Sequence, residues 1–308
     1  MSLGDELYKK HRPTTFRQVV GQSAAVQSLV DMGKRRAVPH TLLFSGPSGC
    51  GKTTLARILR VKLGCSDTDF TELNCADFRG IDMVRDIRNQ MQLRPMAGPC
   101  RVWLIDEVHQ LTAAAQDAFL KILEDTPGHV YFLLATTDPQ KLKQTIRTRC
   151  TDIRVQALTR AQVADLLTTT AADEGAAIAE EVVDAITEQA EGSARRALVL
   201  LHQCLSMSDT EQQIKAVRDS NGQTQAIELA RALVDQRQTW ANVATILKGL
   251  EDEDPEGLRH MVLAYCTKAL LGKAGSKVVP VLQAFRDNFY DSKRAGLVLA
   301  CWEAKHGG

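Results

Sequence analysis

The chain has 308 residues, 44% of them hydrophobic, and a formal net charge of +1, so two or three globular domains are expected and nucleic-acid binding through bulk basicity is excluded. No apolar run is long enough to cross a bilayer, and the first ten residues lack the apolar stretch of a secretory leader, so no membrane contact is expected and a cytoplasmic protein is favoured. The eight cysteines contain no CxxC pair, and we interpret Cys65 and Cys75 as small core residues rather than zinc ligands.

The first motif that predicts chemistry is a glycine-rich loop. It follows the apolar run Thr41 to Phe44, which predicts a buried strand, and precedes a helix predicted from Thr53 to Leu63. The loop, "GPSGCGKT" (46–53), has the phosphate-loop spacing, in which backbone N–H groups wrap a polyphosphate and Lys52 meets its outer oxygens. The helix start attracts an anion, and the Thr53 hydroxyl suits magnesium. The alternative is a surface turn with a solvated lysine, which the strand-to-helix context disfavours.

An amphipathic helix is predicted to begin near Gly80. Its apolar residues recur at helical spacing from Ile81 to Met91, which leaves Arg79 and Arg85 off the core. The exposed backbone amides at the helix start and these two arginines could bind the phosphate backbone of a nucleic acid without recognising its base sequence. Composition alone favours an ordinary solvated face over such a DNA contact.

An acidic motif comes about fifty residues after Lys52. "RVWLIDE" (101–107) is an apolar strand that ends in two carboxylates. Asp106 could hold a magnesium ion through water. Glu107 could act as a base that polarises the water attacking a terminal phosphate. Alone, such a strand end more often marks a turn, but beside a phosphate loop it predicts nucleotide hydrolysis.

The next apolar strand, Tyr131 to Ala135, ends in Thr136 and Thr137. Ligands bind at the carboxyl ends of parallel strands, so one of these hydroxyls is a candidate sensor of the terminal phosphate; the alternative is a threonine pair that only closes the strand. Arg149 follows in "TIRTRC" (145–150). Such an arginine is usually solvated, but after a strand-loop-helix unit it can also be presented to a neighbouring subunit as an arginine finger.

The sequence after residue 156 becomes helical. Three short helices are predicted at 159–175, 177–191 and 193–207, and they would form a lid over the nucleotide. Thr159 and Ser193 are their predicted N-caps, and Gly175 and Gly192 are predicted stops. Periodic apolar residues continue to residue 302 and predict an all-helical third domain, in which the acidic stretch 251–256 is a solvated loop. The expected domains are 1–156, 157–208 and 209–308.

Taken together, these motifs resemble those of the sliding-clamp loader ATPases, a family that includes bacterial DNA polymerase III gamma/tau subunits, small replication-factor-C subunits and phage clamp-loader ATPases. The resemblance covers roughly residues 5 to 205. It implies an α/β AAA+ fold, that is, a P-loop NTPase whose parallel sheet is flanked by helices, followed by a small helical lid and an all-α collar. The matching segments, in family order, are "LYKKHRPTTFRQVVGQ" (7–22), the loop 46–53, "LIDEVHQLT" (104–112), "LLATTDPQKL" (133–142), "TRC" (148–150) and "GSARRAL" (192–198).

The resemblance implies catalytic roles for five residues. Lys52 would contact the phosphates, while Asp106 and Glu107 would be the magnesium-binding and catalytic acids. Thr137 would be the first sensor. Arg149 would reach the ATP of the next subunit in trans.

The resemblance also implies the contacts of ATP and magnesium. Thr53 and Asp106 would hold Mg²⁺, and Arg195 would be the second sensor, bound to the nucleotide from the lid. Arg196 stands where the polymerase subunit usually has an acid, so either arginine of the pair is a candidate. The implied ATP contacts are Tyr8, Arg12, Pro13, Val20, Gly21, Gly46, Ser48, Gly49, Cys50, Gly51, Lys52, Thr53, Thr54 and Arg195.

The helix near Gly80 is interpreted differently once the family is considered. Clamp loaders have "RGI" and a following arginine at a helix that faces DNA, so the resemblance implies a DNA contact by Arg79, Gly80, Ile81 and Arg85. The chain departs from the polymerase subunit in two ways. The four-cysteine zinc module is expected to be absent, and threonine replaces serine before Arg149.

The expected function is that of a clamp-loader subunit that uses ATP and Mg²⁺ to open a sliding clamp and place it on primer-template DNA. Its expected partners are the clamp, this DNA and other loader subunits, in a ring that is expected to be pentameric. One alternative is a ring motor on DNA, such as a branch-migration or helicase-loading ATPase. Another is a nucleotide-dependent scaffold without catalysis, which the intact Lys52, Glu107 and Arg149 argue against.

Overall fold

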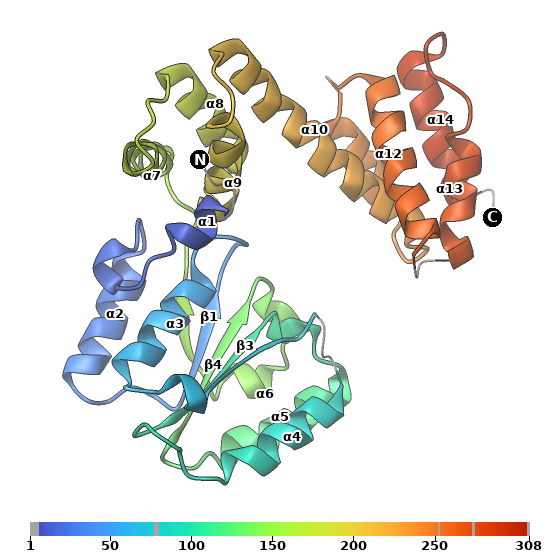
Figure 1. The fold of residues 1–308 in the computed structure, drawn as a ribbon. Helices are drawn as coiled ribbons and strands as arrows, with labels where there is room; N and C mark the ends of the chain where they lie inside the picture. Colours follow the sequence, from blue (N-terminus) through green and yellow to red (C-terminus); the bar gives the residue numbers. More distant parts are fainter. Residues whose placement is uncertain (1–5, 77–79, 252, 273–274, 307–308) are drawn as a thin grey trace. The chain divides into compact units, whose positions relative to one another are not determined.

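The fold was analysed in a computed structural model that describes residues 6–76, 80–251, 253–272 and 275–306, without the side chains of 218–224 and 275–276 (Figure 1). The chain divides into two compact units, residues 1–208 and 209–308. Each unit is described by itself.

A five-stranded parallel sheet is the framework of the first unit. Because β1 lies between β4 and β5, Ser45 is in register with Thr136 on one side and with Arg154 on the other. In a parallel sheet the carboxyl ends of all strands meet at one edge, so the loops after β1, β3 and β4 come together there. The strands, in spatial order, are β2 (Phe70–Asn74), β3 (Arg101–Asp106), β4 (Val130–Thr136), β1 (Thr41–Ser45) and β5 (Thr151–Arg154).

Helices cover both faces of this sheet, which explains why its central strands are continuous apolar runs. Side chains alternate between the two faces along a strand. Leu42 and Phe44 of β1 therefore join one core, whereas Leu43 joins the other. On the first face lie α2 (Ser23–Lys34) and α3 (Lys52–Lys62); on the second lie α4 (Ile81–Met91), α5 (Ala113–Glu124) and α6 (Gln144–Arg147) (Figure 1).

A buried carboxylate, Asp69, holds the turn that leads into β3. Its side chain is fully buried and accepts hydrogen bonds from the backbone N–H groups of Met96 (2.6 Å), Ala97 (2.9 Å) and Gly98 (3.1 Å). Burial by itself would raise the pKa of this carboxyl, but these bonds and that from the Ser66 hydroxyl together lower it. The charged form is therefore the one that the fold stabilises.

Replacing Asp69 by asparagine is expected to lower the free energy of unfolding by about 2 kcal/mol, because an amide cannot accept all of these bonds. The contribution of the carboxylate should be complete above its ordinary pKa, near pH 4, and should be lost as the pH falls further, because the folded-state pKa is lowered. Thermal melts of D69N and wild type between pH 7 and acidic pH measure this contribution of the carboxylate to stability. Asp67→Asn, at a side chain that is 92% exposed, is the control, and equal melting of D69N and wild type at pH 7 would contradict the role.

Three further helices of the first unit follow the sheet: α7 (Arg160–Asp173), α8 (Glu180–Ala190) and α9 (Ala194–Cys204). Both predicted N-caps are confirmed, because the hydroxyls of Thr159 and Ser193 accept from backbone N–H groups in the first turns of α7 and α9. Gly175 and Gly192, the predicted stops, have left-handed φ values of +70° and +75°. The short helix α1 (Leu7–Lys10) packs against α9. A domain boundary at residue 156 stays a prediction.

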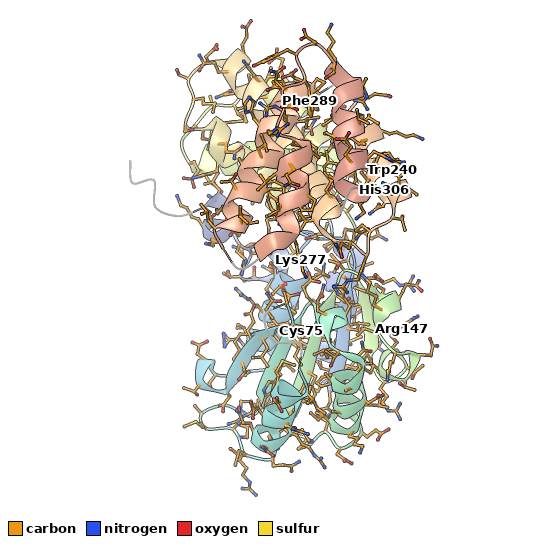
Figure 2. All side chains as sticks on the ribbon, turned by 90° about the vertical axis from the view of Figure 1, so that its right-hand side faces the viewer. Cys75, Arg147, Trp240, Lys277, Phe289 and His306 are labelled. Atoms are coloured by element: carbon orange, nitrogen blue, oxygen red, sulfur yellow. The ribbon has the colours of Figure 1, made fainter. Side chains whose placement is uncertain are left out.

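The second unit is all-helical, as expected. Its apolar core includes Val243, Leu258 and Leu297, and Figure 2 shows Trp240 and His306 close together, with ring centroids 6.1 Å apart. None of the helices in the described part of the chain combines the length and apolarity that a bilayer crossing requires. The helices of the unit are α10 (Thr210–Val234), α11 (Trp240–Gly249), α12 (Pro255–Leu270), α13 (Val279–Ala284) and α14 (Lys293–His306).

The prediction of a solvated acidic loop at 251–256 is wrong for Glu256. This residue lies in the first turn of α12, and its side chain is buried. Its carboxylate accepts from Arg259 Nη2 at 2.6 Å and from the backbone N–H of Phe289 at 2.8 Å. The bond from Arg259 lowers the pKa of Glu256. The acidic stretch in the sequence does not reveal that Glu256 has a hydrogen-bond partner, Phe289, 33 residues away.

Candidate active site

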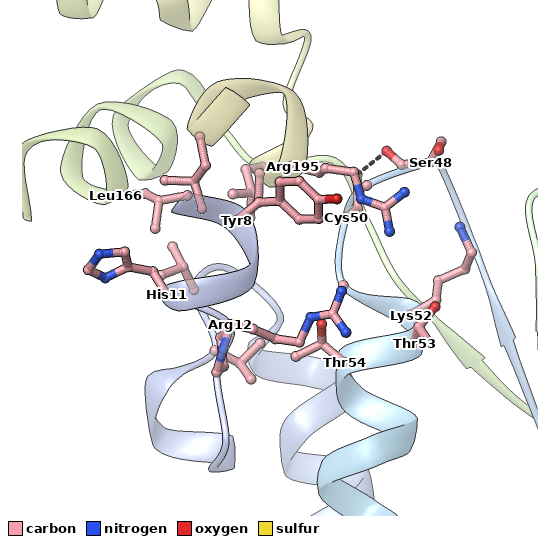
Figure 3. Close-up of a pocket in the computed structure, with 18 of the residues that line it drawn as sticks. Tyr8, His11, Arg12, Ser48, Cys50, Lys52, Thr53, Thr54, Leu166 and Arg195 are labelled. Atoms are coloured by element: carbon pink, nitrogen blue, oxygen red, sulfur yellow. Dashed lines mark hydrogen bonds between the residues drawn. The ribbon is translucent and has the colours of Figure 1, made fainter. Parts of the chain in front are cut away.

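A cavity of the first unit lies where the glycine-rich loop meets the N-terminal segment and the start of α9 (Figure 3). Asp106 and Glu107 also line it. Of the predicted ATP contacts, Gly21 and Gly46 are not in its lining. The other predicted ATP contacts line the cavity: Tyr8, Arg12, Pro13, Val20, Ser48, Gly49, Cys50, Gly51, Lys52, Thr53, Thr54 and Arg195.

Two glycines fix the path of the loop. Gly46 has a φ of +146°, and a Cβ built on it would lie 2.0 Å from the carbonyl oxygen of Val155. Gly49 has a φ of +73°, and its Cβ would lie 2.1 Å from Ser193 Oγ. The loop therefore packs directly on the chain after β5 and on the cap of α9, in backbone conformations that glycine adopts easily.

Lys52 begins α3 and is buried. Its Nζ donates to the carbonyl oxygens of Gly46 and Pro47, each at 2.8 Å, and it makes no ion pair with any described residue. Burial lowers the pKa of Lys52, and the nearby charges of Glu107 and Asp106 oppose this shift. A buried cation at a helix N-terminus, without a carboxylate partner, fits an anionic polyphosphate.

β3 and α3 bring a carboxylate and a hydroxyl together at the edge of the sheet. Thr53 Oγ1 donates to Asp106 Oδ2 at 2.8 Å, and Asp106 Oδ1 accepts from the backbone N–H of Glu107 at 2.9 Å. Hydroxyl and carboxylate oxygens are the hard ligands that Mg²⁺ prefers, usually together with water and phosphate oxygens. The pair thus fits the predicted magnesium site.

Glu107 follows β3 with a left-handed backbone, φ +50°. Its Oε2 accepts from Thr137 Oγ1 at 3.2 Å and lies 3.2 Å from His109 Nδ1. Thr136, the other candidate sensor, is buried and contacts His109 Nδ1 at 3.0 Å. Of the two threonines, Thr137 is therefore the one placed against the predicted catalytic acid, although it does not line the cavity.

Helix α9 and the N-terminal segment form the other walls of the cavity. Arg195 Cζ lies 5.7 Å from the centre of the Tyr8 ring, and the Arg195 backbone N–H donates to the Gly49 carbonyl at 3.2 Å (Figure 3). Arg196 is not part of the lining, which favours Arg195 as the second sensor. Burial lowers the pKa of Arg12, as do the charges of Arg57 and Arg195, so a bound anion would relieve this repulsion.

Gln22 is a buried residue of this region that sequence reasoning missed. Its Nε2 donates to the carbonyl of Gln156 at 2.7 Å, and its Oε1 accepts from the Gln156 N–H at 3.0 Å. Its Nε2 also reaches the Cys50 carbonyl, at 3.4 Å. Gln22 thus ties the N-terminal segment to the loop and to the chain before α7. No local signal reveals it, since its partner is 134 residues away.

Arg149 lies outside the cavity. Its Nη2 donates to Glu124 Oε1 at 2.6 Å, and its Nη1 donates to the Thr145 carbonyl at 3.0 Å. The side chain is 38% exposed. An arginine that acts in trans must lie away from its own cavity, so this placement is compatible with the predicted finger, which stays a prediction.

The predicted DNA contacts are only partly described, because Arg79 lies outside the described residues. Gly80 is the N-cap of α4, Ile81 is half-buried, and the Arg85 side chain is 66% exposed. Arg85 pairs with Asp82 at 3.0 Å. This carboxylate in the first turn competes with an incoming phosphate for the helix start. Elsewhere in the described ranges, no group of three or more His, Cys, Asp or Glu is arranged to hold a metal ion.

Comparisons with known proteins show similarity to DNA polymerase III subunits and to one other family model. The family model of the DNA polymerase III delta subunit matches residues 74–159, and that of the sigma-54 interaction domain matches residues 19–84. The chain is 34% identical over 253 residues to DNA polymerase III subunit tau of Salmonella typhimurium, covering 74% of this chain and 39% of that protein. It is 31% identical over 309 residues to subunit tau of Bacillus subtilis, covering 90% of this chain and 54% of that protein.

Among solved structures, the RuvB Holliday junction branch migration motor of Thermotoga maritima is similar, with a TM-score of 0.58. The alignment covers 73% of this chain and 79% of that one, at 19% identity. At this identity the likeness shows the fold alone, which is that of an α/β AAA+ protein. The chain spans 39% and 54% of the lengths of the two tau subunits.

Proposed function

We propose that this chain is an ATPase subunit of a replication clamp loader. It is a relative of the DNA polymerase III tau subunits, and its resemblance to the clamp-loader AAA+ ATPases is confirmed. The AAA+ fold implies nucleotide binding, typically with Mg²⁺. The observation that carries the proposal is the cavity in which Lys52, buried and without an ion-pair partner among the described residues, lies together with Asp106 and Glu107 at the carboxyl edge of the sheet.

The residues of the cavity would divide the reaction among them. The loop N–H groups and Lys52 would bind the phosphates, and Thr53 with Asp106 would hold Mg²⁺, which neutralises charge on the phosphate oxygens when bound. Glu107 would polarise the attacking water and take up its proton. Thr137 would be the first sensor, and its hydroxyl, which donates to Glu107, would keep that carboxylate oriented toward the attacking water.

The coupling between subunits rests on two arginines. Arg195 would bind the nucleotide in cis, because it reaches the cavity from the lid. Arg149 would reach the nucleotide of the neighbouring subunit, so a complete site would form only in a ring. ATP binding would then close the ring and open a sliding clamp, and primer-template DNA would trigger hydrolysis. We propose a pentameric ring for this work.

Steady-state ATP hydrolysis by the purified protein, with its partner subunits where these exist, tests the proposal. We expect low turnover by the isolated chain and stimulation that requires both the cognate sliding clamp and primer-template DNA. Stimulation by DNA alone would favour a DNA motor instead. Turnover near zero in every assembly would favour a nucleotide-dependent scaffold.

A further inference from the structure

We infer that His109 is a positioning residue that holds Glu107 in the orientation needed for hydrolysis, an inference that rests on the proposed function. His109 belongs to the short 3-10 helix Val108–Gln110, directly after Glu107. Its side chain is only 6% exposed, and it is not in the lining of the cavity. It therefore acts on the site through the carboxylate and not on the nucleotide.

The surroundings of the imidazole fix its tautomer. Ring Nε2 lies 3.1 Å from the side-chain nitrogen of Gln110, which can only donate, so Nε2 accepts. In the neutral ring the proton must then be on Nδ1. Nδ1 makes a hydrogen bond of 3.0 Å with the buried hydroxyl of Thr136, and Glu107 Oε2 lies 3.2 Å from the same nitrogen, so the polarised N–H lies beside the carboxylate.

The contact between His109 Nδ1 and the carboxylate matters because of how Glu107 is held. Its backbone is left-handed and its side chain is 32% exposed, so packing alone does not fix the carboxylate. His109 Nδ1 and Thr137 Oγ1 both approach Oε2, whereas no described residue donates to Oε1. One oxygen thus accepts from Thr137 and lies against His109 Nδ1, and the other is left available to accept a proton from water.

Two substitutions separate positioning from packing. In His109→Asn the amide nitrogen would occupy roughly the place of Nδ1 and keep an N–H beside Glu107, whereas in His109→Gln the amide would lie nearer the place of Nε2. We expect H109N to retain most of the wild-type kcat and H109Q to lose about tenfold or more, because small misplacements of a catalytic group are costly. The KM for ATP and the Kd for a fluorescent ATP analogue should not change in either variant.

The experiment compares kcat, KM, nucleotide Kd and melting temperature of both variants in the clamp- and DNA-stimulated assembly. Adding H109Q to a Glu107→Gln protein should cause no further loss, since the group that His109 orients can no longer act as a base. Equal kcat for H109Q and wild type, or equal losses in H109N and H109Q, would overturn the inference alone. A wild-type protein that binds ATP but never hydrolyses it would overturn the proposed function and, with it, the inference.

Discussion

Replacing Arg149 by alanine is expected to lower ATP turnover by the assembled ring about a thousandfold, while ATP binding stays intact. Arginine fingers stabilise the charge that develops on the transferred phosphoryl group, and their loss has effects of about this size. Arg149 does not line the cavity of its own chain, so its removal leaves the loop, Lys52 and Arg195 in place. The basal turnover of an isolated subunit should therefore be the same in R149A and wild type.

Mixed rings test whether Arg149 acts in trans. R149A subunits keep an intact Lys52, and Lys52→Ala subunits keep an intact Arg149, so a mixture should recover sites that neither variant forms alone. Arg147→Ala, at the last residue of α6 and two residues before Arg149 (Figure 2), is the matched control and should leave turnover nearly unchanged. Failure of the mixture to recover activity, or a fall in the basal rate of isolated R149A, would contradict a role in trans.

Replacing Glu107 by glutamine is expected to lower kcat by about a hundredfold to ten-thousandfold, because an amide cannot take the proton of the attacking water. The amide oxygen can still accept from Thr137, so the site should keep its shape and bind ATP with an unchanged Kd. Such a protein should accumulate in the ATP-bound ring together with an opened clamp.

Single-turnover hydrolysis and clamp retention on primer-template DNA measure these two effects of E107Q. Glu188→Gln, at an exposed position of α8, is the control for the loss of one negative charge. If E107Q hydrolysed ATP at the wild-type rate, the catalytic acid would have to be sought elsewhere at the edge of the sheet.

The strands that sequence predicted are the ones buried on both faces. β1, β3 and β4 are continuous apolar runs because helices cover them above and below. β2 and β5 are the two edge strands of the sheet, and most of their side chains are exposed or half-buried. Polar residues therefore interrupt their apolar pattern. Neither edge strand was predicted, since short mixed segments carry little periodicity.

The same distinction explains what could be predicted of the site. The glycine-rich loop and the acids after β3 are local patterns, because a phosphate-binding turn needs fixed spacings along the chain. Gln22 and Glu124 act through contacts with Gln156 and Arg149 that only the folded chain brings together, and the contact of His109 with the nearby Glu107 depends on the local backbone geometry after β3. Gln22 and His109 lie inside segments that match the family, but neither residue type by itself indicates a buried contact, and Glu124 lies outside every matching segment.

The contact between the loop and α9 has a consequence for nucleotide exchange. The Gly49 carbonyl accepts from Arg195 N–H, and Ser193 Oγ occupies the place where a side chain at position 49 would be. A rotation of α9 away from the loop would break this bond and uncover one side of the loop. In the proposed ATPase, opening of α9 would therefore expose the bound nucleotide and assist ADP release through backbone contacts that take no part in cleaving the phosphate bond.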